Sequence, residues 1–134
     1  MTSIEEHKNS IRELVKDITE KMRSNLLVER QQIIGFSASE ASCNMLALFL
    51  HKRAIISPGF QVNHGYFRSE KLAREKIDVD FPEKKRILEL LVRQEHFRYQ
   101  LWYGRAREKS VVEEAIRNMF SLKELIEGEL GEEI

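Results

Sequence analysis

The sequence predicts an all-α fold, an antiparallel up-and-down bundle of about five helices. Apolar residues recur at three- and four-residue spacing along most of the 134 residues, which is the period of one buried helix face. Only six glycines and two prolines interrupt the chain, and strictly alternating apolar and polar runs are scarce. The connections between the periodic segments are short, so we expect residues 1–134 to form a single domain.

Two helices are predicted in the first half of the chain. Thr2 with Glu5, and Ser37 with Glu40, have the spacing of a capping box, in which two side chains satisfy the first backbone N–H groups of a helix. The first box precedes an amphipathic stripe that ends near residues 25–30. The second precedes a run that is apolar on most of its circumference and ends before the turn sequence SPGF, as expected for a central helix.

Three further helices are predicted in the second half. A short one covers about residues 64–76, after a loop. A long one covers about residues 82–107 and places Pro82 in its first turn, where the missing N–H is not needed. The last begins at a third capping box, Ser110 with Glu113, and carries apolar residues at helical spacing.

The composition argues against several functional classes. Lys and Arg together number 22, and so do Asp and Glu, so there is no overall charge to attract a polyanion or an acidic membrane. The single cysteine, Cys43, lies in an apolar run, which excludes an intrachain disulfide and favours a buried thiol. Neither an apolar run of about 20 residues nor a signal-peptide pattern is present. We therefore expect a cytoplasmic protein that binds no membrane.

One stretch of the predicted fourth helix, RQEHFRYQLWYGR at residues 93–105, combines four aromatic residues, one histidine and three arginines. A helical projection places five polar residues in a stripe beside the apolar face: Arg93, His96, Gln100, Tyr103 and Arg107. Guanidinium groups can hold a phosphate and aromatic rings can stack a base, which are the contacts that a nucleotide or single-stranded RNA requires. The alternative is that Trp102 and Tyr99 complete the core, with arginines lying over aromatic rings.

Two of the four histidines are candidates for a functional site. His64 lies at the start of the short helix and His96 on the polar stripe, and histidine can act as an acid or base on a ribose hydroxyl. His7 and His51 are predicted to be surface or cap residues. No two histidines share a helix at the i, i+4 spacing of a metal site, so we predict neither a metal nor a cofactor.

Two segments carry a resemblance to a known family. The first is the helix SASEASCNMLALFLHKRAIIS, followed by a loop and His64 with GYF. The second is LLVRQEHFRYQLWYGRAREKSVVEEAIRNMFSLKELIEGEL, where an Arg-containing helix with a Tyr just beyond it precedes a short loop and a last helix with Ala115. In order and spacing these elements resemble the HEPN family, the higher eukaryote and prokaryote nucleotide-binding domain, over most of the chain. They look most like its small prokaryotic branch.

The resemblance implies a helical bundle that commonly forms a homodimer and is often encoded beside a minimal nucleotidyltransferase in toxin–antitoxin or defence loci. Many members are metal-independent ribonucleases whose site is an Arg, four to six residues, and a His, paired across the dimer. Here five residues separate Arg93 from Tyr99, so a tyrosine stands where the histidine is expected. A phenol is a poor general base at neutral pH. The candidate catalytic residues are Arg93, His96 and Tyr99.

Three functions follow from the sequence. The first is a HEPN-like protein, without the usual ribonuclease motif, that binds a nucleotide, RNA or a nucleotidyltransferase partner in a two-component system. It would do so through a groove beside Arg93, His96, Tyr99 and Tyr103. The second is a metal-independent ribonuclease that uses Arg93 with His96 or His64. The third is a homodimeric bundle, an interaction module whose aromatic residues form the interface.

Overall fold

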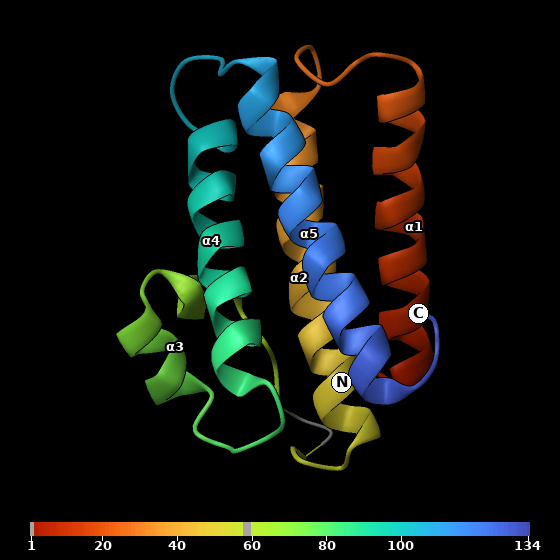
Figure 1. The fold of residues 1–134 in the computed structure, drawn as a ribbon, viewed down its shortest axis with the longest axis vertical. Coiled ribbons are helices and arrows are strands. Elements are labelled where there is room, and N and C mark those ends of the chain that lie inside the picture. The colour runs from red at the N-terminus through yellow and green to blue at the C-terminus, as the bar shows by residue number, and fades with distance from the viewer. Residues whose placement is uncertain (1, 58–59) are drawn as a thin grey trace.

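The chain folds as an all-α bundle, as predicted. The computed structural model describes residues 2–57 and 60–134, and all regular elements within them are helical. The long helices are α1 (Ile4–Arg23), α2 (Gln31–Lys52), α4 (Lys84–Trp102) and α5 (Lys109–Leu130), and the short ones are a 3-10 helix η1 (His64–Phe67) and α3 (Glu70–Lys76). The long helices run alternately up and down, with α2 behind α5 and α3 on the outer side of α4 (Figure 1). The prediction of five α-helices is confirmed.

Helix α2 is the centre of the bundle because it packs against α1, α4 and α5 at once. Between Ile34 and Leu50, every side chain except those of Phe36, Glu40 and Asn44 is buried. A helix that is apolar all round cannot face water, so three neighbours must cover it. The four long helices and α3 contribute to one continuous core around it.

The apolar character of α2 also gives it the length and composition of a membrane-crossing helix, which the sequence reading did not anticipate. It is the one such helix among the described residues. The structure buries 78% of its most apolar window inside the bundle. Packing in the core therefore accounts for the composition of α2.

A glycine sets how closely α2 and α4 approach each other. A Cβ atom at Gly35 would lie 2.7 Å from the Cβ of Leu101, nearer than real side-chain atoms approach. Leu101 is itself 2% exposed, so it has no free space into which to retreat. The second half of α4 consequently lies tight against the first half of α2.

Two amide side chains hold α4 against α5 inside the core. Asn118 Nδ2 donates to the carbonyl of Leu90 and to Oε1 of Gln94, both at 2.8 Å, and Gln94 Nε2 donates to the carbonyl of Ala115 at 3.1 Å. Both amides are at least 95% buried, and leaving such a group unpaired costs about 1–3 kcal/mol. These bonds favour one register of α4 and one rotation about its axis.

The start of α1 differs by one residue from the prediction. Ser3 Oγ accepts from the Glu6 N–H at 3.1 Å, and the Glu6 carboxylate accepts from the Ser3 N–H at 3.4 Å. The capping box is therefore formed by Ser3 and Glu6, and the predicted pair Thr2 and Glu5 was wrong. The helix ends at Arg23, earlier than expected.

The other two predicted capping boxes were wrong as well. Helix α2 begins after Arg30, well before Ser37, and Ile34 in its first turn already packs in the core. Ser37 is buried in the helix interior, where no free N–H group is left to cap. Helix α5 begins after Glu108, and Ser110 lies in its first turn without a capping bond.

The predicted helix over residues 64–76 is divided into η1 and α3. Ser69 has extended backbone and begins a new helix, with its Oγ accepting from the Leu72 N–H at 3.1 Å. The η1 turn is held at its start by Asn63, whose Oδ1 accepts from the Gly65 N–H at 2.8 Å. In the loop that precedes η1, residues 58 and 59 lie outside the described residues.

Helix α4 is shorter than predicted at both ends. It starts at Lys84 behind Glu83, a non-glycine residue with φ of 63°, so Pro82 precedes the helix instead of forming its first turn. At the other end Tyr103 is extended, and Gly104 turns the chain with φ of 79°. Residues 103–107 therefore lie beyond the helix.

The predicted surface position of His7 was also wrong. The His7 ring is 8% exposed, and its Nδ1 lies 2.8 Å from Asn44 Oδ1. It stacks on His51 from α2, with ring centroids 5.5 Å apart. Burial and the neighbouring His7 both lower the pKa of His51. The two rings thus form part of the α1–α2 interface.

We predict that Gly35→Ala destabilises the protein by about 1–3 kcal/mol, because the added methyl group overpacks the contact with Leu101. Gly128→Ala is the matched control, since Gly128 is helical and nothing lies within 4 Å of its missing Cβ. The control should leave the free energy of unfolding unchanged or raise it by about 0.5–1 kcal/mol. Urea unfolding measures both. Equal stability of the two variants would contradict the close approach.

We also predict a loss of stability in acid that depends on His51. Because the folded state lowers the pKa of His51 below 6.5, the unfolded chain binds the proton more readily. The stabilisation is complete above pH 6.5 and is lost as the pH falls through that value towards the folded-state pKa. Urea midpoints at several pH values should fall less steeply in His51→Gln than in the wild type. Identical slopes would show that His51 does not contribute.

Candidate functional site

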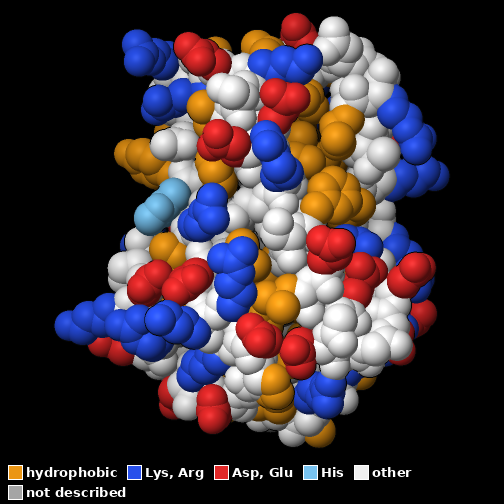
Figure 2. Space-filling model, in the orientation of Figure 1, with side chains coloured by type: hydrophobic (Ala, Val, Ile, Leu, Met, Phe, Trp, Pro, Cys, Tyr) orange, Lys and Arg blue, Asp and Glu red, His pale blue; other side chains and the backbone are white. Residues whose placement is uncertain are grey.

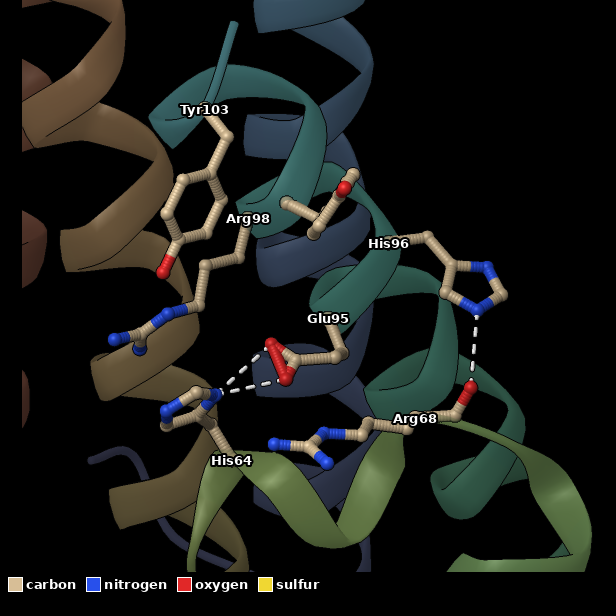
Figure 3. A pocket seen from close by; sticks show the side chains of 7 residues that line it. His64, Arg68, Glu95, His96, Arg98 and Tyr103 are labelled. Carbon is tan, nitrogen blue, oxygen red and sulfur yellow. Dashed lines mark hydrogen bonds and ion pairs between the residues drawn. The ribbon is translucent and has the colours of Figure 1, made fainter.

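A pocket of about 390 Å³ opens on the side of α4 that faces η1. Its lining side chains come from η1, from the residue after it, and from the second half of α4 together with its C-cap (Figure 3). The lining residues are His64, Arg68, Glu95, His96, Arg98, Tyr99 and Tyr103. One pocket is thus lined by both titratable and aromatic side chains.

His64 and Glu95 form a pair at the centre of the pocket. Nδ1 of His64 lies 2.7 Å from Oε2 and 3.0 Å from Oε1 of Glu95. A carboxylate only accepts hydrogen bonds, so Nδ1 carries the proton, and Nε2 of a neutral His64 keeps its lone pair. The Glu95 side chain is 11% exposed and that of His64 is 36% exposed. The glutamate is largely shielded from solvent, and the histidine that it orients is more accessible.

Arg98 is fixed against α2 by three contacts. Its Nη1 lies 2.9 Å from Oε1 of Glu40 and 3.3 Å from the Oγ of Ser39, and its guanidinium lies 4.8 Å from the centre of the Phe36 ring. The side chain is 15% exposed. A buried guanidinium requires such a carboxylate partner. Arg98 therefore presents an oriented set of donors at the pocket wall.

Arg68 and His96 lie at the rim. In Figure 3 the guanidinium of Arg68 and that of Arg98 lie on opposite sides of the His64–Glu95 pair. His96 points to the outside, and its Nε2 makes a long contact of 3.4 Å with the carbonyl of Arg68. Arg68 itself is exposed, so its charge is available to a ligand.

Two tyrosines form an aromatic wall of the pocket. The rings of Tyr99 and Tyr103 lie 5.3 Å apart and are 68% and 58% exposed. Trp102 packs on Phe36 at 5.7 Å and is 38% exposed. The alternative in which Tyr99 and Trp102 complete the core is therefore wrong, because both rings remain at the surface. Its other part, an arginine lying over an aromatic ring, is confirmed by Arg98 on Phe36.

Four of the residues singled out from the sequence meet at this pocket, and three do not. His64, His96, Tyr99 and Tyr103 line it, whereas Arg93, Gln100 and Arg107 do not. Arg93 lies exposed on α4, two residues before Glu95, the first residue of that helix to line the pocket. Gln100 is half-buried outside the lining.

Arg107 is absent from the stripe because α4 ends before it. The loop that carries it is held on the start of α2 by Gln31, whose Oε1 accepts from the Arg107 N–H at 2.7 Å. Nε2 of the same glutamine donates to the Arg107 carbonyl at 3.1 Å. The helical projection was extended five residues too far, so its placement of Arg107 was wrong.

Sequence reasoning missed three residues of the pocket: Arg68, Glu95 and Arg98. Glu95 and Arg98 stand inside the stretch RQEHFRYQLWYGR, yet their partners lie 31 and 58 residues away in the chain. The sequence did contain one signal for Arg98. Four residues separate Arg98 from Tyr103, and the HEPN motif has an interval of four to six residues between its Arg and its His. The sequence prediction counts the interval from Arg93 to Tyr99, and Arg93 lies outside the pocket.

Cys43 lies outside the chemistry of the pocket. It is 6% exposed, and burial, with Glu40 and Glu95 nearby, raises the pKa of its thiol far above the usual range. A thiol in this state is not a nucleophile at neutral pH. Among the described residues no group of three His, Cys, Asp or Glu side chains is placed to hold a metal ion.

Comparison of the chain with protein-family models, with curated proteins and with solved structures finds no match. Its function must therefore be inferred from the pocket itself. The pocket offers two guanidinium groups for an anion, two exposed aromatic faces for a planar ring, and one oriented imidazole. Acidic and basic side chains are intermixed on the face seen in Figure 2, without a broad area of one sign. A local pocket is thus a better candidate for a binding site than that face.

Proposed function

We propose that this protein binds a nucleotide or the end of a single-stranded RNA in the pocket between η1 and α4. The observation that carries the proposal is the placement of Arg68 and Arg98 beside the exposed rings of Tyr99 and Tyr103. Guanidinium groups hold phosphate through charge-assisted hydrogen bonds, and a base stacked on an aromatic side chain contributes about 1–3 kcal/mol. Both contacts are available within one small volume.

The resemblance to the HEPN family supports the same ligand class. We further propose that the chain works as a homodimer beside a nucleotidyltransferase partner in a toxin–antitoxin or defence system, as the resemblance implies. The exposed rings of Phe36 and Trp102, next to the pocket, supply the kind of aromatic surface that is enriched at protein interfaces. The pocket would then lie at the edge of that interface.

The binding proposal predicts that Arg68→Ala weakens the affinity for a short fluorescent oligouridylate about tenfold, because a charged hydrogen bond to phosphate is lost. Arg93→Ala is the matched control, since it removes the same charge from an exposed site outside the pocket. Tyr99→Ala should weaken binding while Tyr99→Phe retains it, because stacking requires only the ring.

Fluorescence anisotropy at about 50 mM and about 200 mM salt measures these affinities and their salt dependence. Saturable, salt-sensitive binding that Arg68→Ala weakens and Arg93→Ala leaves unchanged supports the proposal. Equal effects of the two arginine variants would point to nonspecific charge attraction. A lack of saturable binding at low salt would reject the proposal.

A second candidate function, metal-independent ribonuclease, is favoured by the His64–Glu95 pair. Nε2 of His64 would take the proton from a ribose 2′-hydroxyl, and the 2′-oxygen would attack the adjacent phosphorus. The bond from phosphorus to the 5′-oxygen would break, leaving a 2′,3′-cyclic phosphate, while the departing 5′-oxygen takes a proton from water. The guanidinium groups of Arg68 and Arg98 would stabilise the added negative charge.

The ribonuclease candidate predicts cleavage of unstructured RNA in the presence of EDTA, with loss of activity in His64→Gln and a large loss in Glu95→Gln. Arg93→Ala should cleave like the wild type, because Arg93 lies outside the pocket. An RNA with a single ribose, flanked by deoxyribose, should be cut only at that ribose. Activity that survives in His64→Gln would exclude His64 as the base.

A further inference from the structure

The charges that line the pocket compensate one another almost completely. Arg98 is paired with Glu40 at 2.9 Å, and His64 with Glu95 at 2.7 Å. Arg68 forms no ion pair with any carboxylate in the described part of the chain. Its guanidinium therefore carries a charge that no carboxylate of the described residues offsets.

The resulting net charge of the site is small. Two guanidinium groups, Arg68 and Arg98, are balanced by the two carboxylates Glu40 and Glu95, and only protonation of the histidines makes the site positive. Glu95 lies at the centre with its side chain 11% exposed, so water screens its charge poorly (Figure 3). A second negative charge on a ligand phosphate would meet this carboxylate without a further cation to offset it.

The size of the pocket limits the ligand as well. Its volume of about 390 Å³ falls near the lower end of the range for small-molecule sites, about 300–1,000 Å³. We expect one nucleoside phosphate to fill most of this volume, with its base against the tyrosine wall and its phosphate between Arg68 and the His64–Glu95 pair. A further phosphate would then lie near Glu95.

We infer that the pocket selects a nucleoside phosphate with one negative charge, a phosphodiester, over phosphomonoesters and polyphosphates, and that Glu95 determines this specificity. The inference rests on the proposed function and narrows its ligand from a free nucleotide to the end of a nucleic acid strand, where the phosphate is a diester. Arg68 holds the single charge, the tyrosines hold the base, and Glu95 repels a further charge. Free nucleoside triphosphates are then poor ligands despite carrying the same base.

The test compares UMP with its methyl ester, which share one base, one sugar and one phosphate. UMP carries about two negative charges at pH 7.5 and the ester carries one. Titration calorimetry on the full chain should show the ester binding about tenfold more tightly, the effect of one unit charge at several ångströms in a partly solvated site. UTP should bind more weakly than UMP.

Two variants test whether the charge of the pocket, and not its shape, causes the preference for the ester, because each replaces a carboxylate with an amide of similar size. Glu95→Gln removes the repelling carboxylate, so the preference for the ester should fall to about threefold or less. Glu40→Gln frees the charge of Arg98 and should reduce the preference in the same direction, and circular dichroism confirms that each variant is folded. Wild-type protein that binds UMP or UTP as tightly as the ester would overturn the inference while keeping the proposed function. An unchanged preference in Glu95→Gln would overturn the role of Glu95, and a lack of binding by every ligand would overturn both proposals.

Discussion

The burial of α2 on all sides is the constraint on which the rest of this structure depends. Because its middle is apolar around the whole circumference, α1, α4 and α5 must all pack against it. Gly35 then brings α4 close enough for Leu101 to fill the space of a missing side chain. This contact places the second half of α4 beside residues 39 and 40, where the guanidinium of Arg98 finds its partners.

Polar contacts inside the bundle determine which face of α4 is left for a ligand. The amides of Gln94 and Asn118 bind α4 to α5 and so fix the rotation of α4 about its axis, which leaves Glu95 beside η1 and Arg98 beside α2. Glu95 reaches His64 on η1, and Arg98 reaches Glu40 on α2. Helix α4 thus contributes both to the core and to the pocket, and the partners of Glu95 and Arg98 fix where these two charged groups lie.

Much of the fold could be predicted from the sequence, because helical periodicity is a local property. The apolar stripes of α1 and α5 and the apolar circumference of α2 could all be recognised in the sequence. The starts of the helices were harder to predict. A capping box is recognised in a sequence only by the spacing of two residues, and Ser37 and Glu40 have that spacing although both lie inside a helix. The pocket was half predicted: the aromatic and histidine residues stand out by type, whereas Glu95 and Arg98 gain their roles from partners distant in the chain.

Binding of a nucleotide unit between η1 and α4 can be observed by two-dimensional NMR of the isotope-labelled protein during titration with a short oligouridylate, because each backbone amide reports its own position. We expect saturable shifts confined to residues 63–69 and 92–104, around the pocket, with the amides of α1 unaffected. Shifts centred on another surface, or a spectrum unchanged at low salt, would contradict binding in this pocket.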